Sequence, residues 1–393
     1  MVTAKNVNNN PISIQAQCVP TESFTVFSTL ILLCRPYVIN LGIASNFMKS
    51  TIQILLLIFL TKPSYPQDFR VNYENIEISI PGTPGPWLKH KGKYYCYFKS
   101  DYNNLITNHS FYILDKNGKV DSKVSVPEEL QTFYYDLYIK NDTIFTTEYY
   151  EHHTFYLDEE NKKWVETEKG IDLYYEDTNY VVYSYDFGEW GGVTWFKNKN
   201  TNKQYETGAT SPVVNQFNNA YYLTTSKSVL KIADPQKLKL SKEPYIYEKA
   251  VLDENYFRFE NYSTKGVEIV FKNTFDDYFN PKFSIITSYI SGNSLYHLYK
   301  DSISTKIGII QDKKLVPVYS FKSDIIPFNL NYDSRNPIQN NIYQTVQFTT
   351  IDKNVYGIIE LNGGDITVTY FKYLHKEASW IYLFSFPLFT KRK

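Results

Sequence analysis

Cysteine and methionine are scarce in this sequence of 393 residues, which contains three Cys and two Met. Downstream of residue 67, Cys96 is the sole cysteine, so this part of the chain cannot form an internal disulfide. A domain without disulfides must be held together by its hydrophobic core, and some 320 residues are enough to build one. Cys96 alternates with aromatic residues in KYYCYF, which indicates a buried small residue rather than a nucleophile.

The short motifs of several enzyme classes are also missing. G-x-S-x-G, H-E-x-x-H, G-x-x-x-x-G-K-[ST], G-x-G-x-x-G and paired C-x-x-C do not occur, which argues against serine hydrolases, zincins, P-loop enzymes and dinucleotide enzymes. Glycosidases stay open, because their two carboxylates come from distant positions and leave no short motif. No metal and no cofactor is expected, since the adjacent His152 and His153 would point to opposite faces of a strand.

The N-terminal region contains a pattern typical of export. Met48 and Lys49 precede an apolar run, 52–60, that matches a secretory signal peptide and is too short to span a bilayer. An earlier apolar segment, 23–44, is interrupted by Arg35 and Pro36, and a charge at the membrane centre costs about 2.5 kcal/mol or more. We therefore interpret residues 1–47 as a mis-assigned extension, 48–67 as a signal peptide and 68–393 as a single domain.

This interpretation places the protein in the periplasm, at the cell surface or outside the cell. A retained signal anchor is the alternative, and the protein would meet a membrane only in that case. Removing residues 1–67 takes four basic and one acidic residue from totals of 41 each, so the net charge becomes about −3. This balance argues against nucleic acid as a partner, which calls for a clustered basic surface.

Aromatic residues are abundant, with 37 Tyr and 26 Phe. Together with Ile, Val and Thr they suit pleated, half-buried strands, and Asn, Asp and Gly separate them with turns. Long stretches with helical periodicity are absent. The composition therefore predicts an all-β domain.

The chain also contains a repeated segment, in which an apolar-x-apolar pattern is followed by a polar turn. The copies are FYILDKNGKV at 111, TFYLDEENKKW at 154, VTWFKNKNTNK at 193, VLKIADPQKL at 229, KIGIIQDKKLV at 306 and VYGIIELNGGDITV at 355. Their starts differ by 43, 39, 36, 77 and 49 residues. Because 77 is close to two periods, we interpret VEIVFKNTFDD at Val267 as a further, degenerate copy.

Each copy follows an aromatic strand, and a period near forty built from short strands is typical of β-propeller blades. Over roughly residues 68–390 the chain resembles β-propeller repeat proteins in architecture, without the WD40 or kelch signatures. The resemblance implies about seven four-stranded blades. It also implies that the ring closes between the two ends of the domain. We expect the C-terminal stretch SWIYLFSFPLF, Ser379 to Phe389, to lie beside the segment near Phe69.

The strongest candidate for a binding site is SYDFGEWGGVTW, at 184–195. Asp186, Glu189, Trp190 and Trp195 lie close together there, and glycines permit tight turns. An exposed Trp beside carboxylates would stack on a sugar ring while the acids bind its hydroxyls. Its start also resembles the Asp box of sialidases, S-x-D-x-G-x-T-W, a turn-stabilising element, but Trp190 and Gly191 depart from that pattern.

Two functional hypotheses follow. The first is an exported propeller that binds a protein or glycan partner without catalysis, through loops on one face of the ring. The second is a propeller-type glycoside hydrolase or lyase, with Asp186 or Glu189 as one of two carboxylates. A membrane-anchored sensor or scaffold domain is a weaker third possibility.

Overall fold

The structure is a computed structural model. It describes residues 69–99, 109–131, 135–148, 153–167, 173–186, 192–241, 263–273, 283–322, 325–327, 343–350 and 355–373. Pro66–Lys393 forms one compact unit, distinct from Met1–Tyr65. The predicted signal peptide and extension lie outside the described residues. Among the helices that are described, none is long and apolar enough to cross a membrane.

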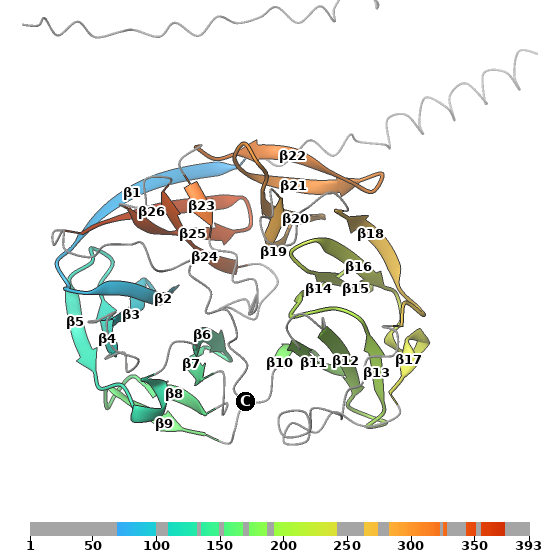
Figure 1. Cartoon of the computed structure of the whole chain (residues 1–393), viewed down its shortest axis with the longest axis horizontal. Coiled ribbons are helices and arrows are strands. Elements are labelled where there is room, and N and C mark those ends of the chain that lie inside the picture. The colour runs from blue at the N-terminus through green and yellow to red at the C-terminus, as the bar shows by residue number, and fades with distance from the viewer. Residues whose placement is uncertain are drawn as a thin grey trace, which may run out of the picture. The chain divides into compact units, whose positions relative to one another are not determined.

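Within this part of the chain the strands form six sheets (Figure 1). The first sheet contains β2 (Thr83–His90), β3 (Lys93–Lys99), β4 (His109–Leu114) and β5 (Val120–Val124), and the second contains β6 (Tyr135–Lys140), β7 (Thr143–Glu148), β8 (Thr154–Asp158) and β9 (Lys163–Glu166). The third contains β10 (Leu173–Glu176), β11 (Tyr180–Asp186), β12 (Gly192–Asn198), β13 (Gln204–Thr207) and β17 (Lys239–Leu240). The fourth contains β14 (Val213–Phe217), β15 (Ala220–Thr224), β16 (Ser228–Ile232) and β18 (Glu268–Lys272).

The fifth sheet contains β19 (Ser284–Ser291), β20 (Ser294–Lys300), β21 (Thr305–Gln311) and β22 (Lys314–Ser320). The sixth contains β23 (Ile325–Pro327), β24 (Tyr343–Thr350), β25 (Tyr356–Asn362), β26 (Asp365–Tyr373) and β1 (Arg70–Ile78). Short 3₁₀ helices, η1 (Glu128–Leu130) and η3 (Pro235–Lys237), lie between strands.

The sheets are arranged around a common centre, and hydrophobic clusters join neighbouring sheets (Figure 1). One cluster packs the first sheet on the second, a second packs the third on the fourth, and others join the fourth to the fifth and the fifth to the sixth. A further cluster joins the sixth sheet to the first. The domain is a six-bladed β-propeller.

Because each blade lies between two others, its central strands are buried on both faces. In β3, of sequence KYYCYFK, the five residues from Tyr94 to Phe98 are all buried. This is why the aromatic strands of the repeat lack polar alternation. Cys96 is buried among them, which confirms its structural interpretation, and burial raises the pKa of its thiol.

The predicted number of about seven blades is one too many. The six clear copies of the repeat fall on β4, β8, β12, β16, β21 and β25, one per sheet. The supposed seventh copy, at Val267, leads into β18, which pairs with β16 as the outer strand of the fourth blade. The spacing is doubled because β17 first pairs with β13 of the third blade. The chain then returns to the fourth blade.

The ring closes between the start and the end of the domain, and the segment near Phe69 completes the last blade by pairing with β26. The C-terminal stretch 379–389 lies outside the described part of the chain, so its place beside this segment stays a prediction. β1 pairs with β26 in parallel, without interruption, from Arg70↔Asp365 to Ile78↔Tyr373. The last blade therefore combines a strand from the start of the domain with strands from its end.

β1 changes its apolar face half-way along. Val71 and Tyr73 pack on the cluster between the fifth and sixth blades, where the Tyr73 hydroxyl lies 3.2 Å from the Tyr319 hydroxyl. Ile76, three residues after Tyr73, and Ile78 belong to the cluster between the sixth and first blades. Side chains alternate between faces along a strand, so an odd spacing from Tyr73 to Ile76 places the two halves on opposite faces.

The second half of β1 fits closely against the first blade. A Cβ added to Gly118, in the turn between β4 and β5, would lie 2.3 Å from the Ile76 Cγ2 atom. Gly118 also has a φ of +81°, which few other residues adopt. A glycine is therefore required at position 118, where β1 packs against the β4–β5 turn of the first blade.

Substitution of Ile78 tests how much this contact stabilises the domain. Ile78 is fully buried, so we expect Ile78→Ala to lower the free energy of unfolding by about 2–5 kcal/mol, through lost burial and the cavity left behind. Ile303→Ala is the matched control, because Ile303 is 77% exposed, and its effect should be under about 0.5 kcal/mol. Urea unfolding measures both; similar losses in the two variants would contradict the closure.

Candidate functional site

The sequence-predicted binding loop is carried by the β11–β12 hairpin of the third blade. The two strands pair without interruption from Tyr180↔Asn198 to Asp186↔Gly192. Asp186 is thus the last residue of β11. Glu189 and Trp190 lie between the two strand ends, outside the described residues, so their roles stay predictions.

Trp195, the fourth predicted residue, is a core residue. It is fully buried in β12 and is among the largest buried side chains of the described residues. Its neighbours Thr194 and Phe196 are fully buried as well, because the third blade is covered on both faces. The indole of Trp195 therefore presents no surface to a sugar ring.

Ser184 fixes the base of this hairpin. The Thr194 hydroxyl donates to Ser184 Oγ at 3.0 Å and lies 2.9 Å from the carbonyl oxygen of Ala209. The backbone N–H of Ser211 also donates to Ser184 Oγ, at 3.1 Å. Tyr174, at the start of the blade, donates its hydroxyl to Ser211 Oγ at 3.0 Å.

These bonds join β10, β11 and β12 to the chain that leads into the fourth blade. Buried and hydrogen-bonded polar groups of this kind resist displacement, because a broken bond leaves a polar atom without solvent. Ser184 thus fixes the strands that lead to the predicted loop. The turn-stabilising role that the Asp-box resemblance implies stays a prediction, because the turn lies outside the described residues.

A cluster that sequence reasoning missed lies between the first and second blades. It consists of Lys99 at the end of β3, His109 at the start of β4 and Tyr135 at the start of β6, and we call it the Lys99 cluster. The Tyr135 hydroxyl lies 3.1 Å from His109 Nδ1, and Lys99 Nζ lies 5.9 Å from the centre of the Tyr135 ring. The Gln131 side chain anchors the cluster, since its Oε1 accepts from the His109 backbone N–H at 2.6 Å.

Burial lowers the pKa of Lys99 to about 8. Its ammonium is nevertheless charged at neutral pH and lies over the face of an aromatic ring, which favours a cation. Such an ammonium can bind an anionic or strongly polar group at the edge of the blade. No local pattern signalled this cluster, because Lys99 ends an ordinary strand and meets Tyr135 only through the packing of two blades.

The Lys99 cluster lies at the same face of the ring as the ends of β11 and β12 that flank the predicted loop. β3 and β4 are the second and third strands of their blade, and β11 and β12 hold the same places in theirs. In blades of equivalent orientation, connections between these strands emerge at one face. The two sites are thus contributed to that face by the first and third blades.

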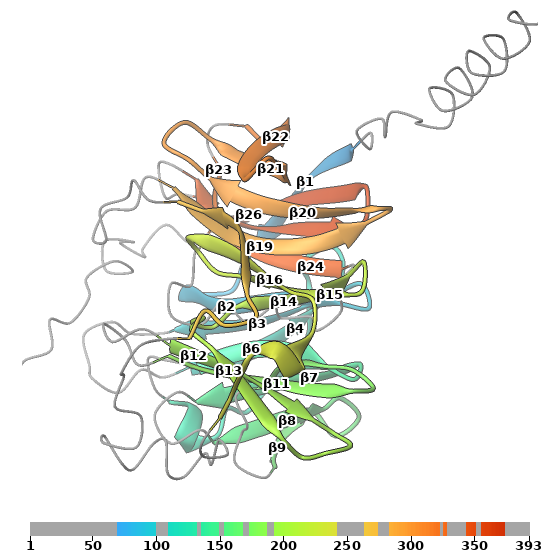
Figure 2. The same cartoon turned by 90° about the vertical axis from the view of Figure 1, so that its right-hand side faces the viewer.

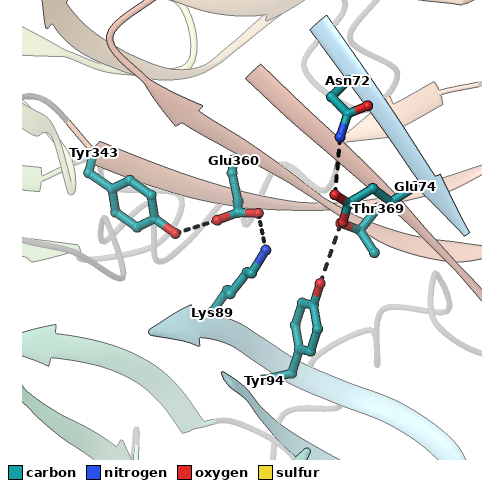
Figure 3. Close-up of polar contacts among 7 residues, drawn as sticks. All are labelled: Asn72, Glu74, Lys89, Tyr94, Tyr343, Glu360 and Thr369. Carbon is teal, nitrogen blue, oxygen red and sulfur yellow. Dashed lines mark hydrogen bonds and ion pairs between the residues drawn. The ribbon is translucent and has the colours of Figure 1, made fainter. Parts of the chain in front are cut away.

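A second, partly buried charge cluster lies between the first and sixth blades (Figure 3). Lys89 Nζ lies 2.5 Å from Glu360 Oε2, and the Tyr343 hydroxyl donates to Glu360 Oε1 at 2.7 Å. Burial lowers the pKa of Lys89, but the hydrogen bond and charge of Glu360 outweigh it, so the pKa is raised. Tyr94 extends the contact, with its hydroxyl 3.5 Å from Thr369 Oγ1.

The Lys89–Glu360 pair joins the two blades that β1 also joins. Each charge already has its partner, and separating them would leave a buried charge uncompensated. We therefore assign this pair to blade packing rather than to ligand binding. For metals, no group of three or more His, Cys, Asp or Glu side chains within the described ranges is placed to hold an ion.

No protein-family model matches the chain, and no curated protein is significantly similar to it. Similar solved structures include the β-propeller domain of the Trilobed protease from Pyrococcus furiosus, at 12% identity and a TM-score of 0.33, covering 72% of this chain and 96% of that one. An endo-arabinase from Bacteroides thetaiotaomicron VPI-5482 has 10% identity and a TM-score of 0.30, covering 74% and 97%. Kluyveromyces lactis Hsv2 has 11% identity and a TM-score of 0.28, covering 75% and 96%. These proteins differ widely in kind, and none indicates a function for this chain.

The pH dependence of stability tests the environment of Lys99. Its pKa is about 8 in the folded protein and 10.5 ordinarily, so between these values the unfolded chain binds more protons than the folded one. The folded protein is therefore stabilised as pH rises through this range. The apolar variant Lys99→Met lacks this dependence, and its stability relative to wild type should be highest below pH 8 and decline toward pH 10.5.

Urea unfolding of both proteins at several pH values measures this difference. Lys116→Met, at an exposed position of the same blade, is the control and should follow wild type throughout. If Lys99→Met also follows wild type at every pH, the proposed burial of the ammonium is wrong.

Proposed function

We propose that this protein is an exported, non-catalytic binding module, which holds a protein or glycan partner on the face that carries the β11–β12 connection. Export is supported by the signal-peptide pattern at residues 48–67. Binding through connections on a rigid ring is a common use of such scaffolds, because the blades fix the loop ends while the loops vary.

One observation carries the proposal. The β11–β12 hairpin is paired to its last residues, Asp186 and Gly192, and the buried Ser184 hydrogen bonds fix its base. Glu189 and Trp190 lie in the five residues between these two paired ends in the sequence. A Trp held near carboxylates loses little conformational freedom on binding and offers a flat apolar surface to a sugar ring or a protein.

The Lys99 cluster also favours this face as the binding surface. Its ammonium supplies a positive charge in the first blade, whereas the predicted loop supplies the carboxylates Asp186 and Glu189 in the third. A partner that spans the ring would meet opposite charges at separate points, which favours one orientation over others.

Substitution of Trp190 tests the proposal. Wild type and Trp190→Ala are compared on an immobilised glycan panel and in affinity capture from envelope extracts of the source cells. We expect Trp190→Ala to lose at least ten-fold in affinity for the bound glycan or protein without a change in melting temperature, since the side chain would contribute contact and not folding.

Ile303→Ala is the control for loss of an exposed apolar side chain. Ile303 lies in the connection between β20 and β21, which has the same place in the fifth blade, and this variant should bind like wild type. Unchanged binding by Trp190→Ala would exclude the loop. Turnover of a glycoside that disappears in Asp186→Asn would contradict the non-catalytic assignment.

A further inference from the structure

A pocket of about 430 Å³ lies between the fourth and fifth blades, outside the blades that carry the predicted loop and the Lys99 cluster. It is lined by residues of β18, the outer strand of one blade, and of the β21–β22 hairpin of the next. We call it the rim pocket. Its volume is in the range of small-ligand sites. In both views the β21–β22 hairpin is at the opposite side of the ring from β8 and β9 (Figure 2).

Aromatic side chains form the wall of the rim pocket. The ring centres of Phe271 and Phe283 are 5.7 Å apart, and those of Phe283 and Tyr299 are also 5.7 Å apart. Gly308 makes room for the last of these rings, since a Cβ at this position would lie 3.0 Å from Tyr299 Cε1. Phe271 and Phe283 are partly exposed and form an apolar surface that joins both blades, with the buried Tyr299 ring behind them.

Lysines surround this surface. Lys272, Lys306, Lys313 and Lys314 line the pocket, and Asp301 is the sole acidic residue among the described lining residues. Asp301 is paired with Lys306, at 2.5 Å between carboxylate and ammonium. Within the described part of the chain, the other three lysines have no ion pair. The described lining residues therefore carry an excess of about three positive charges, in a chain whose formal net charge is zero.

The hairpin fixes two of these lysines in place. Gln311 pairs with Lys314, so the turn of the β21–β22 hairpin consists of only Asp312 and Lys313. Both turn residues have positive φ, 48° and 60°, as in the tight type I′ turn that matches the twist of a hairpin. Lys313 and Lys314 are therefore held at the mouth of the pocket rather than on a long loop. Asp312, in the same turn, is not among the lining residues.

We propose that the rim pocket binds an acidic sugar, with its ring against the aromatic wall and its carboxylate or sulfate on the free lysines. Aromatic faces stack on the apolar C–H face of a sugar ring, and ammonium groups bind anionic oxygens. The described lining residues offer four lysines grouped around one pocket. A long polyanion such as nucleic acid, which needs an extended basic track, does not match this distribution.

This site is separate from the proposed function, because it uses other blades and none of the predicted loop residues. Binding at the rim pocket is consequently expected to be the same in Trp190→Ala as in wild type. The two proposals can fail independently.

Calorimetric titration of the purified protein at low salt tests the rim pocket. The probes are a hyaluronan tetrasaccharide for carboxylate, a heparin tetrasaccharide for sulfate, chitotetraose as a neutral sugar, and AMP as an anion with a base. We expect binding of at least one acidic tetrasaccharide, weakened by added salt, and no binding of chitotetraose.

The variant with Lys272→Gln, Lys313→Gln and Lys314→Gln should weaken this binding by at least ten-fold. Its control carries Lys116→Gln, Lys162→Gln and Lys203→Gln, which remove the same charge from exposed positions in other blades, and should bind like wild type. Phe271→Leu, which keeps apolar volume but removes a ring, should also weaken binding.

Several results would overturn the proposal. These are the absence of binding by both acidic tetrasaccharides, binding of AMP alone, or an equal loss in the pocket variant and its charge-matched control. Equal loss would show a response to net charge rather than to the pocket.

Discussion

The parallel pairing of β1 with β26 is the constraint on which the rest of the propeller depends. A single blade cannot cover both of its faces, so each one is stabilised only by its neighbours, and a ring with one unjoined interface would expose two apolar sheets. β1 prevents this because its two halves are apolar on opposite faces. Val71 and Tyr73 complete the packing on the fifth blade, and Ile76 and Ile78 complete the packing on the first. The partly buried Lys89–Glu360 pair lies on the interface between the sixth and first blades that this strand also joins.

The two proposed binding sites lie on different blades of the ring. Where the second and third strands of the blades connect, the proposed partner-binding face has a loop with Trp190 on a base fixed by Ser184, and an ammonium at Lys99. Between the fourth and fifth blades, a short β18 beside a longer hairpin leaves Phe271, Phe283 and several lysines partly exposed. Both arrangements follow from inter-blade packing, since each needs side chains from elements far apart in the sequence. The absence of catalytic motifs fits with recognition through such composite surfaces.

The sequence predicted the all-β propeller because the repeat is local: each copy contains one strand and one turn, and the six clear copies fall on equivalent strands. It predicted one blade too many because a spacing alone cannot show that β17 leaves to pair with the third blade before β18 completes the fourth. Trp195 was grouped with the loop because it is near in sequence. It lies in the core because β12 is buried on both of its faces. The Lys99 cluster and the rim pocket could not be predicted, since their residues meet only across blade interfaces.

Changing the alternation of side chains between the two faces of β1 is the most direct test of this account. Deleting Asn75 alone would make the spacing from Tyr73 to Ile76 even, and would turn Ile76 and Ile78 away from the first blade. Deleting Glu74 and Asn75 together keeps the spacing odd, so each half of β1 keeps its own face. One half is then shifted by two residues in its pairing with β26. We expect urea unfolding to show a larger loss of stability for the single deletion than for the double deletion. If the double deletion is equally or more damaging, the ring is not closed by the alternating faces of β1.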